Sequence, residues 1–109
     1  MKPVSFLGNS VDELRAFPDG ARREAGFQID RLQRGLDPYD WKPMKSIGAG
    51  VREIRVKEAS GALRLIYVAT LSEAIYILHA FQKKTSATAR RDLSLAANRF
   101  RELMREKGQ

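Results

Sequence analysis

Five cationic residues in the second half of the chain are spaced so that a small sheet would bring them together. They lie in or next to three apolar segments separated by short polar turns: Arg55, Lys57, Arg64, Lys83 and Lys84. Residues two apart in a strand share a face, so Glu53, Arg55 and Lys57 are expected to point away from the core together. Arg64, just across the turn, should join them on this exposed face. Guanidinium groups bind phosphate oxygens through two donors and ammonium groups add point charge. The spacing predicts a phosphate-binding strip.

Two further groups of residues have both a functional and a plainer interpretation. Arg90 and Arg91 lie just after the strip and could add phosphate contacts, or they could belong to a solvated helix face. His79 could act as a general acid or base. It follows Ile75 and Ile77 at every second position, however, which also fits a packed, hydrogen-bonded histidine. The strip itself could serve solubility, since exposed sheet faces often carry Lys and Arg.

The excess of positive charge lies in the same half of the chain as the strip. The formal net charge is +7 and the isoelectric point is near 10.1. Residues 1–50 carry 8 basic and 7 acidic side chains, whereas residues 51–109 carry 12 and 6. A polyanionic partner such as nucleic acid would bind mainly through the second half.

The absence of certain residue types and motifs limits the kinds of catalytic site that the chain could form. The chain has no Cys and one His, which excludes a thiolate zinc site or a His-rich metal cluster. It also lacks a phosphate-binding glycine loop and a nucleophile-elbow motif. We therefore expect any enzyme activity to use no metal and no cofactor. RNA cleavage fits, because the 2′-hydroxyl is an internal nucleophile that the protein need only align while it neutralises charge.

Helices are expected near both ends of the chain. Ser10 and Glu13 form a capping-box pattern for a brief helix that reaches Phe17. Pro18 is suited to begin a second helix, and Gly35 to end it. A last helix with an apolar stripe should follow the N-cap candidates at 85–88.

Strands are expected between these helices. Residues 2–7 could form a first strand, and 36–50 a loop held to the core by Trp41. Three apolar segments separated by short turns should pair antiparallel: 51–57, 63–70 and 74–81. We predict one α+β domain over residues 1–109, located in the cytoplasm because no apolar run approaches the roughly 20 residues of a membrane span.

Several segments together resemble one known family. They are Trp41-Lys42-Pro43-Met44-Lys45, Arg52-Glu53-Ile54-Arg55-Val56-Lys57, Gly61-Ala62-Leu63-Arg64-Leu65-Ile66-Tyr67-Val68 and Leu78-His79-Ala80-Phe81-Gln82-Lys83-Lys84-Thr85. From about residue 11 to 105 the chain resembles the RelE/ParE superfamily of type II toxin–antitoxin toxins. The last segment, followed by an Arg-rich helix, is typical of its HigB-like, phage-related branch.

The resemblance implies a RelE-like fold, with an N-terminal helical hairpin packed on a small twisted antiparallel sheet and a C-terminal helix. It also implies an mRNA interferase, a ribosome-dependent endoribonuclease that contacts rRNA and cuts translated mRNA without metal. The expected ends are a 2′,3′-cyclic phosphate and a 5′-hydroxyl. A cognate helix-turn-helix antitoxin would neutralise the toxin.

The resemblance also assigns roles to the strip. Arg55 would activate the 2′-oxygen or hold the phosphate, and Arg64 would stabilise the transition state. Lys83 and Lys84 match a basic pair of which one cation faces the leaving 5′-oxygen. Lys57 would contact rRNA or phosphate.

Two differences from the best-understood RelE toxins concern proton transfer. Glu53 stands where those toxins have a basic residue, and the last helix has no Tyr. The identity of the general base is therefore open, and His79 could take over part of the proton transfer. Two other functions also stay open, a ParE-like inhibitor of DNA gyrase and a non-catalytic nucleic-acid-binding domain.

Overall fold

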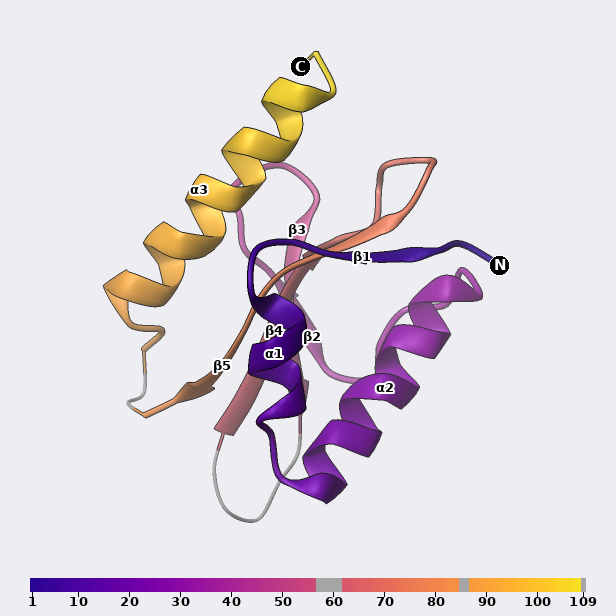
Figure 1. Cartoon of the computed structure of the whole chain (residues 1–109), viewed down its shortest axis with the longest axis vertical. Coiled ribbons are helices and arrows are strands. Elements are labelled where there is room, and N and C mark those ends of the chain that lie inside the picture. The colour runs from indigo at the N-terminus through magenta and orange to yellow at the C-terminus, as the bar shows by residue number, and fades with distance from the viewer. Residues whose placement is uncertain (57–61, 85–86, 109) are drawn as a thin grey trace.

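A five-stranded sheet with helices on both faces forms the fold (Figure 1). The computed structural model describes residues 1–56, 62–84 and 87–108 of the 109-residue chain. The elements follow one another as β1 (Val4–Phe6), α1 (Ser10–Arg15), α2 (Asp19–Gln33), β2 (Trp41–Pro43), β3 (Val51–Val56), β4 (Ala62–Val68), β5 (Ile75–Lys83) and α3 (Arg90–Glu106). This arrangement confirms the predicted α+β fold, with two N-terminal helices and a C-terminal helix packed on the sheet.

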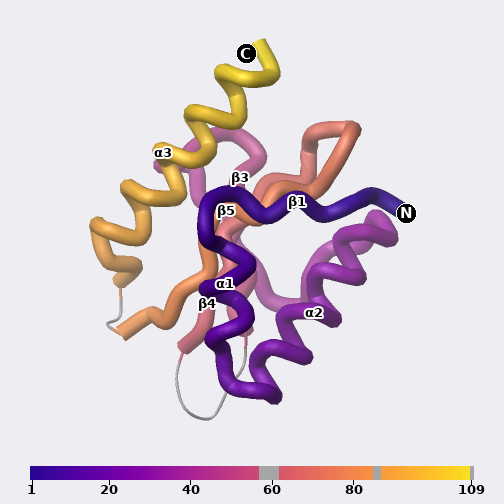
Figure 2. The backbone as a smooth tube through the Cα atoms, in the orientation of Figure 1, coloured from indigo at the N-terminus to yellow at the C-terminus, as the bar shows by residue number. Residues whose placement is uncertain are grey.

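The strands lie side by side in the order β1-β5-β4-β3-β2. Strands β2 to β5 pair antiparallel, which confirms the prediction for the three central ones. Strand β1 runs parallel to β5 and lies beside it (Figure 2). A parallel neighbour needs a long crossover, and here most of the domain lies between the two strands in the sequence. Local sequence patterns do not predict such a pairing.

A register shift interrupts the pairing of β4 with β5. Ile66 pairs with His79, but the next residue, Tyr67, pairs with Ile77. Leu78 is therefore an extra residue on β5, which makes the irregularity a β-bulge.

The bulge decides which residues of β5 share a face. Ile77 packs in the apolar cluster beneath α2, but beyond the bulge it is Ala80 that does so. His79, Phe81 and Lys83 consequently turn to the opposite face, the one that α3 covers. The predicted face of His79, shared with Ile77, was wrong because a strict alternation cannot show an inserted residue.

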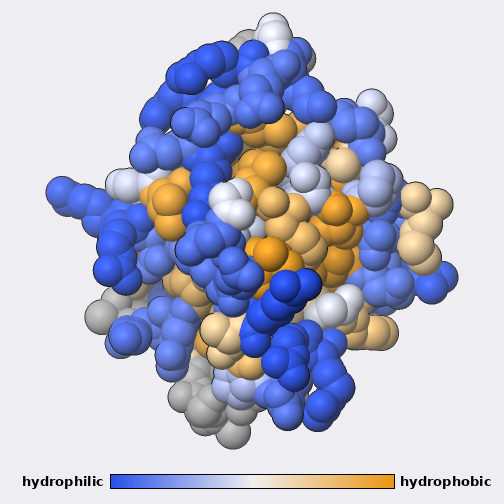
Figure 3. Space-filling model, viewed as in Figure 1, coloured by the Kyte–Doolittle hydropathy of each residue, from blue (hydrophilic) through white to orange (hydrophobic). Residues whose placement is uncertain are grey.

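Apolar side chains fill the space on both faces of the sheet. One cluster joins the sheet to α1 and α2, and its helical members include Leu14, Ala21, Ala25, Ile29 and Leu32. The other joins the sheet to α3 through Ala96 and Leu103, with Phe100 partly buried. In the space-filling view, hydrophobic residues show between the hydrophilic outer surfaces of the helices (Figure 3). Among the described residues, every helix is too short or too polar to span a lipid bilayer.

The first helix begins where expected but without its predicted capping box. Asn9 is the N-cap and makes no side-chain capping bond. Ser10 is fully buried, and its hydroxyl donates to the Ile77 carbonyl at 3.2 Å. Glu13 turns toward His79 instead of back to the helix start. Tertiary contacts with β5 therefore outcompete the local capping interaction.

The second helix follows its sequence signals closely. Pro18 is the N-cap residue, α2 begins at Asp19, and Gly35 adopts a φ of +81°, in the left-handed region that suits a helix end. The segment 36–50, predicted to be a loop, contains β2, which pairs with β3. Three residues are too few to give a periodic signal, which is why this short edge strand was missed.

An ion pair fixes the C-terminal end of α3 to the loop before β5. The Lys107 ammonium lies 2.8 Å from Glu73 Oε2, and the Tyr76 hydroxyl donates to the same oxygen at 2.9 Å. The Lys107 hydrogen bond is the largest cause that lowers the pKa of Glu73 from 4.5 to about 2. The same bond raises the pKa of Lys107 to about 12.

We expect Glu73→Gln to lower the melting temperature modestly at neutral pH, since exposed ion pairs contribute little. Folding lowers the pKa of Glu73. The stability that its ion pair contributes is therefore fully present above pH 4.5 and is lost as the pH falls toward about 2. Thermal melts of both proteins should therefore differ at pH 7 and converge near pH 2. A constant difference across that range would contradict this account.

Candidate nucleic-acid interface

A buried carboxylate lies at the centre of the cationic residues. Glu53, on β3, is completely buried on the face that α3 covers. Its Oε1 lies 3.7 Å from the Lys42 ammonium and 3.6 Å from Arg64 Nε, distances at which the attraction is electrostatic. The Thr88 hydroxyl, just before α3, donates to Oε2 at 3.3 Å. Cations from two neighbouring strands thus converge on one anion.

Strand register sets this convergence. Lys42 of β2 lies directly opposite Glu53, and Arg55 lies directly opposite Arg64 on β4. The bulge brings Lys83 to the same face. We call Lys42, Arg55, Arg64 and Lys83 the basic cluster.

Members of the basic cluster differ in exposure. The Arg55 side chain is 43% exposed, and its guanidinium lies 3.8 Å from an Asp40 carboxylate oxygen. The Arg64 side chain is only 13% exposed, and its Nη1 donates to the Leu63 carbonyl at 3.0 Å. Arg55 is therefore the member freest to meet a ligand, while Arg64 is held in place by the protein.

The environment of Lys83 makes its proton easier to lose than that of an ordinary lysine. Burial is the main cause that lowers the pKa of Lys83, and the positive charge of Lys42 lowers it further. Glu53 opposes this shift, while Arg64 and Arg55 add to it. A lysine in such surroundings is suited to donate a proton in a reaction.

A cleft of about 530 Å³ lies next to the basic cluster, between β5 and the first turns of α3. Its cationic lining residues are Lys83, Lys84 and Arg91, and its acidic ones are Glu13 and Asp92. Lys83 belongs to both the cleft and the basic cluster, so the two form one continuous site.

The structure brings together most residues of the predicted strip. Arg55, Arg64 and Lys83 gather around Glu53, and the exposed Lys84 borders the cleft. Lys57 lies outside the described residues. Two expectations of exposure were wrong: Glu53 is buried, and Arg64 is mostly so, because the segment before α3 reaches across this face of the sheet.

The two arginines that begin α3 are placed differently. Both are exposed, but Arg91 lines the cleft and Arg90 does not. Arg91 is therefore positioned to contact a ligand in the cleft.

Comparison with known proteins identifies a family for most of the chain. Residues 12–101 match the family model described as Phage derived protein Gp49-like (DUF891). The chain belongs to this Gp49-like family. The matched range contains the whole basic cluster and most of α3. A search of curated proteins gave no significant match.

His79 lines the cleft, but both of its ring nitrogens are occupied. Nδ1 lies 3.0 Å from Glu13 Oε1 and Nε2 lies 2.7 Å from Asp92 Oδ1. The residue is 2% exposed. In this arrangement neither nitrogen is available to a substrate.

Two residues of the site in this Gp49-like protein were missed in the sequence. Lys42 was assigned to a loop, and only its pairing opposite Glu53 places it in the basic cluster. Thr88 was seen as a helix cap, but Ala89 is the N-cap and Thr88 binds Glu53. For Lys42, the sequence offered one signal: the residue follows Trp41 in a segment that carries the family resemblance.

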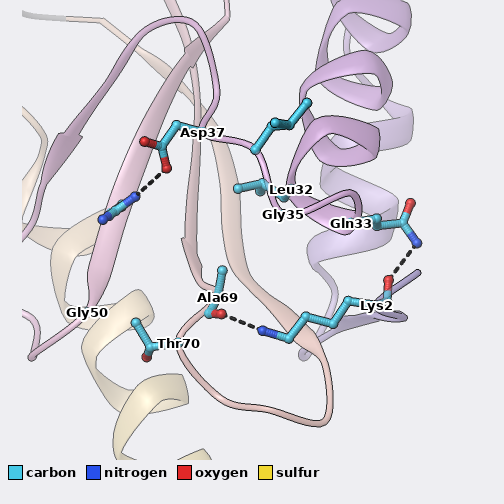
Figure 4. Close-up of a pocket in the computed structure, with 10 residues that line it drawn as sticks. Lys2, Leu32, Gln33, Gly35, Asp37, Gly50, Ala69 and Thr70 are labelled. Carbon is cyan, nitrogen blue, oxygen red and sulfur yellow. Dashed lines mark hydrogen bonds and ion pairs between the residues drawn. The ribbon is translucent and has the colours of Figure 1, made fainter.

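A second cavity, of about 270 Å³, lies beside the C-terminal end of α2 (Figure 4). Its polar groups largely bind one another. Lys2 donates to the Ala69 carbonyl at 2.6 Å, and the Arg52 guanidinium lies 3.2 Å from Asp37. Within the described parts of the chain, no cluster of three or more His or acidic side chains is arranged to hold a metal ion.

We expect Glu53→Gln to lower the free energy of unfolding by about 1.5–3 kcal/mol, the usual loss for a bond to a charged group. Lys42 and Arg64 would keep their charges and lose the carboxylate between them. Chemical denaturation measures the change, with Glu102→Gln, an exposed position on α3, as control. Equal stability of the two variants would show that Glu53 does not hold the cluster.

Proposed function

We propose that this protein is the toxin of a type II toxin–antitoxin system and acts as a ribosome-dependent mRNA endonuclease. The observation that carries the proposal is the basic cluster, assembled from four strands around Glu53 and continuous with a cationic cleft. Membership of the phage-derived Gp49-like family supports it. The finer placement in the HigB-like branch rests on the 78–85 segment described above.

In the proposed reaction the 2′-oxygen attacks the adjacent phosphorus, and the bond from phosphorus to the 5′-oxygen breaks. The 2′-hydroxyl loses a proton and the leaving 5′-oxygen gains one, which gives a 2′,3′-cyclic phosphate and a 5′-hydroxyl. Charge grows on the phosphate oxygens in the transition state, where a fixed guanidinium stabilises it most. Arg64 is the best-fixed cation and takes this role.

The other cations bind or transfer protons around that phosphate. Arg55, exposed at the edge of the cluster, holds the phosphate or the 2′-oxygen. Lys83, whose pKa is lowered, donates the proton to the 5′-oxygen, with Lys84 beside it at the rim of the cleft. Arg90, Arg91 and Lys57 contact neighbouring phosphates of mRNA or rRNA.

Glu53 has a supporting role in this scheme. Its Oε1 is buried without a hydrogen-bond partner among the described residues, so substrate does not reach it. Its negative charge allows several cations to lie close together without strong mutual repulsion. Glu53 therefore maintains the cluster and is not the general base.

A toxin of this kind has two partners, mRNA on the ribosome in the cytoplasm and a neutralising helix-turn-helix antitoxin. The decisive experiment incubates ribosomes, message and purified protein, and then maps the new 5′ ends. Cleavage within translated codons, with 5′-hydroxyl ends, is expected. Intact message at protein concentrations that stop translation would contradict the proposal. Accumulation of cleaved DNA–gyrase complexes would favour the ParE-like gyrase inhibitor. RNA binding without any cleavage product would favour a non-catalytic nucleic-acid-binding domain.

We expect Arg64→Ala to lower the cleavage rate by about 10² to 10³, the usual loss for one preorganised donor. It should also cost about 1–3 kcal/mol of stability, since the side chain is mostly buried beside Glu53. Arg64→Lys separates the two effects. It keeps a positive charge next to Glu53 but loses the planar fork, so it should melt near the parent and cleave slowly.

The matched control is Arg23→Ala, because Arg23 is an exposed arginine on α2, on the other side of the sheet. This variant should cleave at the parental rate. If Arg64→Lys folds and cleaves as fast as the parent, the assignment of Arg64 to the transition state is wrong.

A further inference from the structure

His79 lies between two carboxylates that come from different helices. Glu13 belongs to α1 and Asp92 to the first turn of α3, and each lies within hydrogen-bond distance of one ring nitrogen. The ring also stacks on Phe81, with centroids 5.0 Å apart and planes 13° apart. The imidazole thus joins both helical layers to β5.

The hydrogen-bond partners select one protonation state of the ring. An ionised carboxylate only accepts hydrogen bonds, and a neutral imidazole has a single N–H donor. A neutral ring would therefore point a lone pair at one of the two carboxylates in a buried site. The imidazolium donates from both nitrogens and satisfies both acceptors.

The charges around the ring also balance. Glu13 faces it from α1 and Asp92 from α3, while Ile66, opposite on β4, carries no charge. Arg99 of α3 lies 3.5 Å from Glu13 Oε1 and donates to the Leu78 carbonyl at 2.7 Å. Asp92, His79, Glu13 and Arg99 form an alternating series of two negative and two positive groups, which offsets the cost of burying them.

We propose that the His79 imidazolium is a positioning group that fixes the start of α3 at the nucleic-acid site. Asp92 is next to Arg91, which lines the cleft, and four residues after Thr88, which binds Glu53. The start of α3 is thus fixed at two points, to β5 through His79 and to β3 through Glu53. His79 acts on RNA through Arg91 and carries no proton to the substrate. This effect on RNA rests on the proposed function, whereas the charge state of the ring does not.

The charge state is tested by ¹⁵N–¹H NMR of the imidazole in the whole protein at neutral pH. Both ring nitrogens of His79 should carry a proton. In Asp92→Asn, the amide can donate to one ring nitrogen, so a neutral ring with one proton should replace the imidazolium. Asp12→Asn, in the first turn of α1, is the matched control and should keep both protons. A single proton in the parent would overturn the proposal.

The positioning role is tested by the salt dependence of binding to a short single-stranded oligoribonucleotide. Arg91→Ala should reduce the slope of log K against log salt by about one, the loss of one phosphate contact. His79→Gln should produce the same reduction, and the double variant should add nothing further. If His79→Gln does not fold, Asp92→Ala removes the same attachment from the helix side. Additive effects, or an unchanged slope in a folded variant, would overturn the role.

The two proposals fail in different ways. If the parent does not bind RNA, or if Arg55→Ala and Lys83→Ala leave binding unchanged, the proposed function is wrong. Amide hydrogen exchange in residues 90–95 then tests the positioning alone. It should speed up in Asp92→Ala and not in Asp12→Asn, and equal exchange in both would overturn it.

Discussion

The burial of one carboxylate, that of Glu53, constrains the whole site. A carboxylate withdrawn from water is costly unless cations or hydrogen-bond donors surround it. Here Lys42 comes from the edge strand, Arg64 from the central strand β4 and Thr88 from the segment before α3. Each partner is brought by a different element, so Glu53 joins the edge of the sheet, its centre and the last helix. The same charge lets Arg55 and Lys83 lie close to the other cations.

A second buried ionic group supports the first from the other side of the cleft. His79 holds α1 and α3 on β5 while Glu53 holds the segment before α3 on β3. The two attachments are four residues apart on the chain, at Thr88 and Asp92. Between them lie Arg90 and Arg91, which the proposed function places on RNA. Buried polar groups of this kind specify one arrangement, because any other would leave charges unpaired.

The bulge in β5 places His79 and Lys83 on the same face of the sheet as Glu53 and Arg64. If all the residues of β5 alternated strictly, with no bulge at Leu78, Lys83 would share the α2 face with Ile77 and lie away from Arg64. Bulges frequently turn side chains toward functional sites. In this fold a single inserted residue converts a buried strand into one that contributes both the positioning histidine and a lysine with a lowered pKa.

The sequence by itself determined the three helices and the three central strands, and it indicated a cationic strip. Apolar periodicity, Pro18 and Gly35 marked the helices, and alternating apolar segments marked the three central strands, because these signals are local. The types and spacing of Arg55, Arg64 and Lys83 indicated a phosphate site for the same reason. Only the tertiary structure decided that Glu53 is buried, that Lys42 lies opposite it, that Ser10 and Thr88 bind distant partners, and that His79 bonds two helices. These features depend on strand register and on contacts between residues up to 67 apart in the chain. The free energy of such contacts belongs to the packed fold, so no short stretch of sequence encodes it.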